Sequence, residues 1–192
     1  MTRLYKLYQD LLKRFGEPGP WPWFDNEPAH TREEIIIGAI LVQHTNWRNS
    51  AMAISNLRKA GKSSLRSIRR ARGETIKRLI RPAGFYQQKA QRLKSVAEFL
   101  SRGPVKREEL LKVKGVGEET ADTILLYAYN KPTFIIDAYT RRFVNYFHLT
   151  KHKDYQSLKT YFETRLPKNV KLYQNYHALI VQWGKNNHEY IP

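Results

Sequence analysis

The fold is decided by LLKVKGVGEETADTILLYAYNKPTFIID, the stretch from Leu110 to Asp137. Apolar residues end one helical pattern, Gly115-Val116-Gly117 forms a turn, and apolar residues then recur every three or four positions. Glycines permit positive φ and keep side chains away, so backbone N–H groups at the start of the second helix can meet a phosphate. We therefore predict a helix-hairpin-helix at residues 106–129, although the pattern also fits an ordinary pair of antiparallel helices.

The composition favours a polyanionic partner. The chain has 34 Lys and Arg against 17 Asp and Glu, which gives a formal net charge of +17. Such an excess is also compatible with RNA, an anionic membrane surface or a well-solvated exterior. The apolar runs are too short to span a bilayer, and the N-terminus lacks the apolar segment of a signal peptide. We expect a cytoplasmic protein that acts on nucleic acid, without a membrane partner.

The absence of cysteine restricts the chemistry of the chain. It excludes disulfides, thiolate zinc sites, cysteine-bound iron–sulfur clusters and a cysteine nucleophile. His148 and His152 have a helical metal-ligand spacing, but Thr150 and the charged run Lys151 to Lys153 are typical of a surface turn. We therefore expect no metal site, and we expect carboxylates, amines, imidazoles or hydroxyls to carry the chemistry.

The periodicity predicts an all-α fold. Because 41 % of the 192 residues are hydrophobic, we also expect the chain to bury a hydrophobic core. Thr31 and Glu34 have the spacing of a capping box in front of an apolar helix that we expect to be central. The many aromatic residues after Asp137 favour a core over a base-stacking surface. The other helices are expected at Arg3 to Phe15, Trp47 to Ala60, Ser64 to Ala71, Glu74 to Ile80, Tyr86 to Ser101, Arg107 to Val113, Glu118 to Tyr129, Ala138 to Phe147, Tyr155 to Leu166 and Val170 to Asn187.

Three motifs make the chain resemble the helix-hairpin-helix (HhH-GPD) DNA glycosylases related to endonuclease III. They are LVQHT at Leu41 to Thr45, GFYQQKAQRL at Gly84 to Leu93, and VKGVGEETADTILLYA followed by FIIDAYTRR. The resemblance implies two helical lobes with a cleft between them, residues 1–24 with 138–192 and residues 25–137. It also implies a partner, double-stranded DNA containing a damaged base, and we expect a monomer.

Asp137 matches the catalytic aspartate of the family, which follows the hairpin at the start of a helix. Breaking an N-glycosidic bond generates an oxocarbenium-like sugar, and a nearby carboxylate can stabilise it as in glycosidases. The same carboxylate could direct or deprotonate the attacking water. Asp137 is also well placed as a helix N-cap, and the two roles are compatible.

Glu119 departs from the pattern of the bifunctional members of the family, which carry a lysine at this position and form a Schiff base. A carboxylate cannot form an imine, so the substitution favours a monofunctional enzyme that uses water. Lys112 and Lys114 lie near but do not align with that lysine, which leaves weak lyase activity open. Glu119 also suits the first turn of any helix.

Among relatives without cluster cysteines, the chain is most similar to the third class of 3-methyladenine DNA glycosylase. That class has a Trp- and Pro-rich segment before the central helix, which Trp21-Pro22-Trp23-Phe24 matches. Alkylated purines are cationic and attract aromatic faces. We therefore assign Trp21, Trp23, Phe24 and Glu119 to a base pocket, while the aromatic residues also suit a loop staple.

The resemblance further assigns residues that contact DNA. Gln43 is the candidate wedge that fills the hole left by the extruded base, or else a buried amide that satisfies backbone groups at a helix end. The candidates for DNA-backbone binding are Lys89, Lys114, Gly115, Val116, Gly117, Glu118 and Thr120. For Lys89, surface solvation is the alternative. No cofactor is expected, apart from a monovalent cation that the hairpin could hold.

These observations predict a monofunctional glycosylase that removes N-alkylated purines, of the 3-methyladenine and 7-methylguanine class, by hydrolysis. Two alternatives stay open. One is a glycosylase for oxidised or mismatched bases, with or without lyase activity. The other is a helix-hairpin-helix module that binds DNA without catalysis.

Overall fold

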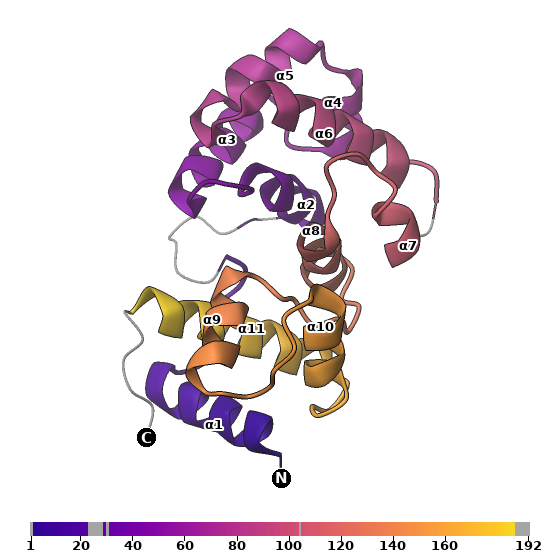
Figure 1. Cartoon of the computed structure of the whole chain (residues 1–192). Helices are drawn as coiled ribbons and strands as arrows, with labels where there is room; N and C mark the ends of the chain where they lie inside the picture. The colour runs from indigo at the N-terminus through magenta and orange to yellow at the C-terminus, as the bar shows by residue number, and fades with distance from the viewer. Residues whose placement is uncertain (1, 23–28, 30, 104, 187–192) are drawn as a thin grey trace. The chain divides into compact units, whose positions relative to one another are not determined.

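The structure is a computed structural model that describes residues 2–22, 29, 31–103 and 105–186. The chain divides into two compact units, unit 1 (Met1–Phe24 and Asn130–Pro192) and unit 2 (Asp25–Tyr129), drawn in Figure 1. The described residues form helices and no strand, which confirms the predicted all-α class. No helix among them is long and apolar enough to cross a membrane.

In the described part of unit 1 there are four helices: α1 (Arg3–Phe15), α9 (Ala138–Tyr146), α10 (Tyr155–Glu163) and α11 (Val170–Lys185). Each begins at a polar side chain that accepts a backbone hydrogen bond, which satisfies a donor that the first helical turn leaves unpaired. The long helix α11 packs against α1 and α9 (Figure 1). Ten of the 16 residues of α11 are buried, so this helix lies in the core of unit 1.

The core of unit 1 is largely aromatic, as the sequence predicted. The rings of Phe134 and Phe162 stack at 4.2 Å, and the ring of Phe143 meets that of Trp183 edge to face. Tyr176 is fully buried, and its hydroxyl donates to the Leu4 carbonyl at 2.9 Å. These rings therefore hold α1, α9, α10 and α11 together and are not available to stack on bases.

Unit 2 contains the remaining helices, and α2 (Arg32–Leu41) is its centre. Ile36, Ile37 and Ile40 have no exposed surface, and α2 packs against α3, α6 and the π-helix η2. The other elements are α3 (Trp47–Lys59), α4 (Leu65–Arg70), α5 (Gly73–Leu79), the 3₁₀ helix η1 (Arg81–Ala83), α6 (Tyr86–Leu100), α7 (Arg107–Leu110), α8 (Glu118–Thr123) and η2 (Ile124–Ala128). An apolar helix at the centre of the core agrees with the prediction from its sequence.

The start of α2 keeps one half of the predicted capping box. Thr31 Oγ1 accepts from the Glu34 amide at 3.2 Å. The carboxylate of Glu34, however, pairs with the guanidinium of Arg58 on α3 through two bonds of 3.0 and 2.9 Å. A bidentate pair of this kind is stronger than a neutral hydrogen bond, so Glu34 joins two helices of unit 2.

The division between the units falls between residues 129 and 130, whereas the sequence predicted it after Asp137. The reason is the burial of the apolar residues Phe134, Ile135 and Ile136, which are at most 1 % exposed. Phe134 stacks on α10, and its amide donates to the Glu163 carboxylate at 2.8 Å. Asp137 is therefore held by unit 1 on both sides of its backbone.

Lys89 is a fully buried lysine in unit 2. Its Nζ donates to the carbonyls of Leu41, at the end of α2, and Ala83, at the end of η1, both at 2.7 Å. Burial, with a smaller contribution from the Arg92 guanidinium, lowers the pKa of Lys89 to about 8. The prediction that Lys89 contacts a DNA phosphate is wrong, because its ammonium group is enclosed in the core.

The hairpin depends on Gly115, whose φ of 87° lies in the left-handed region. A Cβ at this residue would lie 2.5 Å from the Arg92 side chain, whereas a Cβ at Gly117 would have no atom within 4 Å. Gly117 has a φ of −88° and is the N-cap of α8, with no side-chain cap. The two glycines of the turn therefore have different physical requirements.

Replacing Gly115 with Ala should destabilise unit 2, whereas the same change at Gly117 should not. Ala at a positive φ costs about 1–2 kcal/mol, and the contact with Arg92 adds to this cost. The Gly117→Ala variant should change the free energy of unfolding by less than about 0.5 kcal/mol. Urea unfolding of both variants tests this, and equal losses would contradict the assigned turn geometry.

Replacing Lys89 with Met should remove a pH-dependent term from the stability. The pKa of Lys89 is about 8 in the folded chain against an ordinary value of 10.5, so its protonation opposes folding. The cost is complete below about pH 8 and disappears as the pH rises towards 10.5. Relative to Lys89→Met, the wild-type free energy of unfolding should therefore rise by about 2 kcal/mol between about pH 7 and pH 10.

Urea unfolding of the two proteins at both pH values measures this difference, and other titrating groups cancel in the comparison. A constant difference between wild type and Lys89→Met would show that the ammonium group is not desolvated.

Candidate active site

Asp137 is the N-cap of α9. Its Oδ1 accepts a hydrogen bond from the Thr140 amide at 2.7 Å. The Thr140 hydroxyl donates to the Ile135 carbonyl at 3.3 Å, and the Ile136 amide lies 3.4 Å from the Tyr155 hydroxyl, its acceptor. The segment that leads into α9 is thus tied on both sides of the aspartate, which fixes the direction of its carboxylate.

The other carboxylate oxygen of Asp137 faces His177 on α11. Asp137 Oδ2 lies 3.4 Å from His177 Nε2, and the two side chains are 14 % and 6 % exposed. Burial raises the pKa of Asp137, but the His177 ring and the Thr140 amide together lower it below the ordinary value. Asp137 is therefore a largely buried carboxylate that stays ionised at neutral pH.

The hairpin residues predicted to bind the DNA backbone differ in exposure. Lys114 and Gly117 are exposed, and Glu118 is partly exposed at 3.5 Å from the Arg107 guanidinium. Val116 and Thr120 are 5 % and 8 % exposed, so their side chains belong to the interior of unit 2. Phosphate binding by the hairpin stays a prediction. The groups that could make such contacts are the backbone groups of Val116 and Thr120 and the side chain of Lys114.

Gln43 connects the hairpin to the rest of unit 2. Its Nε2 donates to the Gly115 carbonyl at 3.1 Å and to Thr120 Oγ1 at 2.9 Å, while its Oε1 accepts from Arg92. These bonds use the donors and the acceptor of the amide. These contacts agree with the alternative of an amide that satisfies backbone groups, and the wedge role of Gln43 stays a prediction.

Two neighbouring aromatic side chains of unit 2 are exposed instead. Phe85 is 62 % exposed, and its ring centroid lies 6.3 Å from that of His44. Both residues have positive φ values, 45° for Phe85 and 54° for His44, which is unusual for residues other than glycine. Backbone strain of this kind is typical of functional sites.

The predicted base pocket is described only in part. Trp21 is 8 % exposed in unit 1, and Glu119 is exposed on α8 of unit 2. Trp23 and Phe24 lie outside the described residues. The assignment of these four residues to one pocket stays a prediction.

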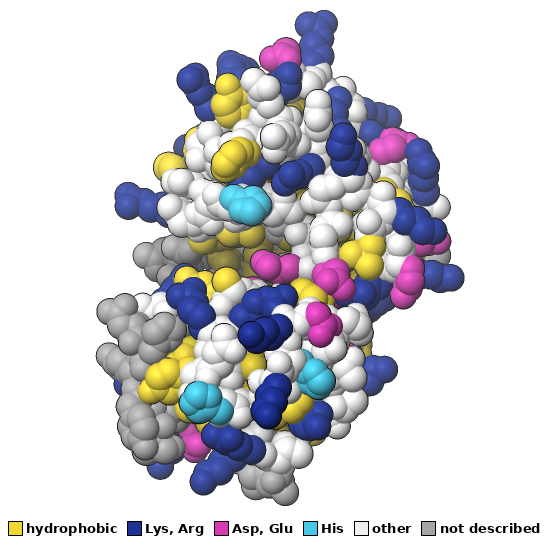
Figure 2. Space-filling model, viewed as in Figure 1, with side chains coloured by type: hydrophobic (Ala, Val, Ile, Leu, Met, Phe, Trp, Pro, Cys, Tyr) yellow, Lys and Arg dark blue, Asp and Glu magenta, His cyan; other side chains and the backbone are white. Residues whose placement is uncertain are grey.

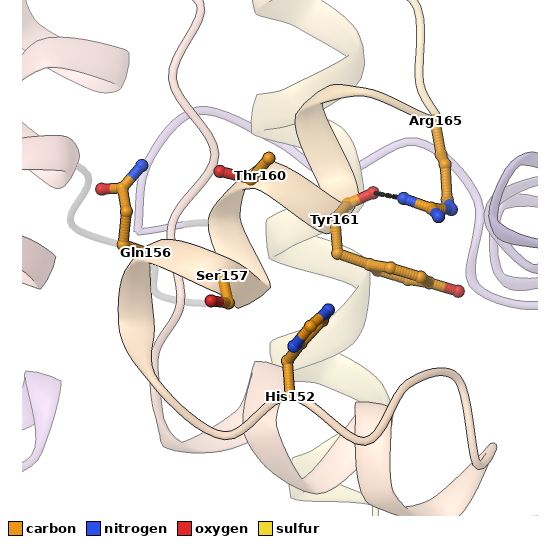
Figure 3. Close-up of a pocket in the computed structure, with 6 residues that line it drawn as sticks. All are labelled: His152, Gln156, Ser157, Thr160, Tyr161 and Arg165. Atoms are coloured by element: carbon orange, nitrogen blue, oxygen red, sulfur yellow. Dashed lines mark hydrogen bonds between the residues drawn. The ribbon is translucent and has the colours of Figure 1, made fainter.

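A surface pocket of about 220 Å³ lies on α10 in unit 1 (Figure 3). The Arg165 guanidinium covers the Tyr161 ring at 4.2 Å and donates to the Tyr161 carbonyl at 3.4 Å. The lining is completed by His152, Gln156, Ser157 and Thr160. None of the predicted site residues lines this pocket, and it is therefore separate from Asp137.

The surface is strongly basic. Figure 2 shows Lys and Arg side chains spread over the visible face of each unit. Acidic side chains are fewer there, as the net charge of +17 requires. Within the described residues, no group of three or more His, Asp or Glu could hold a metal ion. The absence of cysteine excludes a cysteine-bound iron–sulfur cluster.

Two residues were not predicted from the sequence: His177, which faces Asp137, and Phe85, which is exposed beside His44. His177 is a lone histidine in a helix that is apolar on most sides, and such a histidine usually belongs to the core. Phe85 stands in the GFYQQKAQRL motif, where Gly84 marks a turn. The position of Phe85 directly after the turn residue Gly84 was the one feature of the sequence that could have indicated an exposed ring.

Comparison with known proteins identifies the family. Residues 37–168 match the family described as HhH-GPD superfamily base excision DNA repair protein. A candidate DNA repair glycosylase of Methanocaldococcus jannaschii is 40 % identical over 197 residues, which cover 95 % of this chain and 87 % of the relative. Endonuclease III of Thermotoga maritima is 26 % identical, covering 86 % of this chain and 76 % of the relative.

Solved structures agree with this assignment. The 3-methyladenine DNA glycosylase of H. pylori bound to 1,N6-ethenoadenine matches with a TM-score of 0.83 and 27 % identity, covering 98 % of this chain and 100 % of that one. A complex of endonuclease III with DNA matches with a TM-score of 0.80 at 17 % identity, over 96 % of this chain and 87 % of that one, and supports the fold alone. The predicted fold and the predicted class, a DNA N-glycosylase, are confirmed. The chain belongs to the HhH-GPD superfamily of base excision DNA repair proteins.

Proposed function

We propose that this enzyme is a monofunctional glycosylase that removes N-alkylated purines, such as 3-methyladenine and 7-methylguanine, from double-stranded DNA by hydrolysis. The observation that carries the proposal is the Asp137 carboxylate, which stays ionised although its side chain is only 14 % exposed. A charge in such a place stabilises a developing cation more strongly than it would in water.

In this mechanism the C1′–N bond breaks, and the bonding electrons leave with the base. An N-alkylated purine is cationic in DNA, so it departs as a neutral base without a proton donor. The sugar becomes an oxocarbenium-like cation, which Asp137 stabilises. Water then attacks C1′, and its proton passes to the Asp137 carboxylate and on to solvent. One carboxylate is sufficient for this sequence of steps.

Glu119 supports the hydrolytic reaction. It stands where the bifunctional relatives carry their lysine, and a carboxylate cannot form a Schiff base with the sugar. The product would therefore be an abasic site in an unbroken strand. Lys114, exposed beside Gly115, is assigned to phosphate contact rather than to imine formation.

The substrate class rests on two observations. The chain resembles a 3-methyladenine DNA glycosylase over nearly its whole length, at a higher identity than the endonuclease III complex. The Trp- and Pro-rich segment at residues 21–24 supplies aromatic rings, whose faces attract cationic bases. Both observations favour alkylated purines over oxidised or mismatched bases.

The hairpin is proposed to hold the DNA backbone. No side chain caps the start of α8, and Gly117 leaves the backbone open to an approaching phosphate. The net charge of +17 adds attraction that does not depend on sequence. The monomeric state and a monovalent cation at the hairpin remain predictions within this proposal.

We assign the wedge role to Phe85, which lies beside His44, instead of to Gln43. Extrusion of a base leaves a gap in the duplex, and an inserted aromatic ring can stack on the bases that flank the gap. Phe85 has the exposure that this role requires, whereas the Gln43 amide is held in hydrogen bonds.

Release of free bases tests the proposed function. The purified protein is incubated with duplex DNA that contains methylated purines, and the released bases are separated by chromatography. We expect 3-methyladenine or 7-methylguanine, together with strand breaks that appear only after alkali. Breaks without alkali would indicate lyase activity, and release only from oxidised or mismatched duplexes would overturn the substrate class.

Asp137→Asn should abolish excision while DNA affinity and folding are kept. Asparagine is as good an N-cap as aspartate, so α9 should still begin at this residue. Loss of the charge should lower the single-turnover rate by about 10²–10⁴-fold. The matched control is Asp154→Asn, which changes the exposed N-cap of α10 in the same unit. Normal excision by Asp137→Asn would overturn the mechanism.

Phe85→Ala should slow excision because the stacking of one aromatic ring is lost, which corresponds to about 1–3 kcal/mol. We expect the single-turnover rate or the DNA affinity to fall about 10-fold or more, with an unchanged melting temperature. Met52→Ala is the control, since Met52 is also an exposed apolar residue of unit 2. If the two variants excise equally well, Phe85 is not the wedge.

A further inference from the structure

The two oxygens of the Asp137 carboxylate have different surroundings. Oδ1 is occupied by the Thr140 amide at 2.7 Å and cannot turn away without uncapping α9. Oδ2 does not take part in this helix cap, and it lies 3.4 Å from His177 Nε2. The oxygen that would face a sugar cation or a water molecule is therefore the one beside the histidine.

His177 is held in place by its helix. It is 5 % exposed on α11, and its helical neighbours Tyr173, Tyr176 and Ile180 have no exposed surface. α11 packs directly against α9, which begins at Asp137. A ring enclosed in this way has few alternative rotamers, so its position relative to the carboxylate is set by the packing of two helices.

We propose that His177 is a positioning residue that acts through Asp137: its ring fixes the direction of Oδ2 for reaction with the sugar. This inference rests on the proposed function. A carboxylate moved into a largely buried site tends to take up a proton, and the neutral acid cannot stabilise a cation. A histidine at ion-pair distance opposes that tendency and also restricts rotation of the carboxylate about its cap bond.

The competing explanation is that His177 only fills the core of unit 1. Replacement would then lower stability, and the folded fraction would excise bases at the wild-type rate. The two explanations differ in two respects. If His177 positions Asp137, the folded variant is slower than wild type, and a replacement side chain with a donor near Nε2 restores the rate. Glutamine places an amide donor near the position of Nε2, whereas leucine fills similar space without a donor.

The first test measures single-turnover excision of methylated purines by the full chain with saturating enzyme. We expect His177→Leu to be about 30-fold slower than wild type, with unchanged affinity for the duplex, and His177→Gln to recover most of the rate. His152→Leu, an exposed histidine of the same unit, is the control. A wild-type rate in His177→Leu, or equal rates in the Leu and Gln variants, would overturn the inference.

The second test does not depend on activity or on the Leu variant being folded. The carboxyl carbon of Asp137 is followed by NMR as the pH is lowered, in wild type and in His177→Gln, with Asp137→Asn used to assign the signal. We expect the wild-type carboxylate to remain ionised to a lower pH than in His177→Gln. Identical titrations would overturn the inference. If the wild type releases no base but the titrations differ, the proposed function fails while the role of His177 stands.

Discussion

The hydrogen bond from the Thr140 amide to Asp137 Oδ1 is the interaction on which the site depends. It is an ordinary helix cap, yet it decides where a buried charge points. The apolar residues before Asp137 are packed into unit 1, so the carboxylate cannot move unless that packing is disrupted. The direction of this carboxylate is thus set by secondary structure, because the side chain that begins α9 is also the one that faces His177.

A second constraint operates within unit 2, where the three motifs of the sequence meet in one hydrogen-bond network. Gln43 comes from the first motif, Arg92 from the second, and Gly115 with Thr120 from the third. The network also explains why residue 115 is a glycine, since the Arg92 side chain occupies the space that a Cβ would need. The hairpin is therefore held in its shape by side chains far away in the sequence.

Helical periodicity was sufficient to predict most of the fold. The helix predicted at Arg3 to Phe15 has those bounds. Asp137, Asp154 and Asn169 are the N-caps of α9, α10 and α11, as expected of polar residues that precede an apolar helical pattern. The interior polar contacts could not be predicted in this way. Lys89 was expected at the surface, because nothing local distinguishes a buried lysine from an exposed one. The partners of Gln43 and His177 likewise depend on how helices pack.

The exposed pair His44 and Phe85 shows what packing alone leaves unexplained. Two non-glycine residues at positive φ each cost about 1 kcal/mol or more, and the exposed ring of Phe85 adds little apolar burial to offset that cost. At such φ values, backbone conformation alone would favour glycine. The loops persist because Lys89 ties the ends of α2 and η1, which precede His44 and Phe85, into the core. The buried ammonium group of Lys89, whose protonation itself opposes folding, thus holds two strained loops in place through two backbone carbonyls.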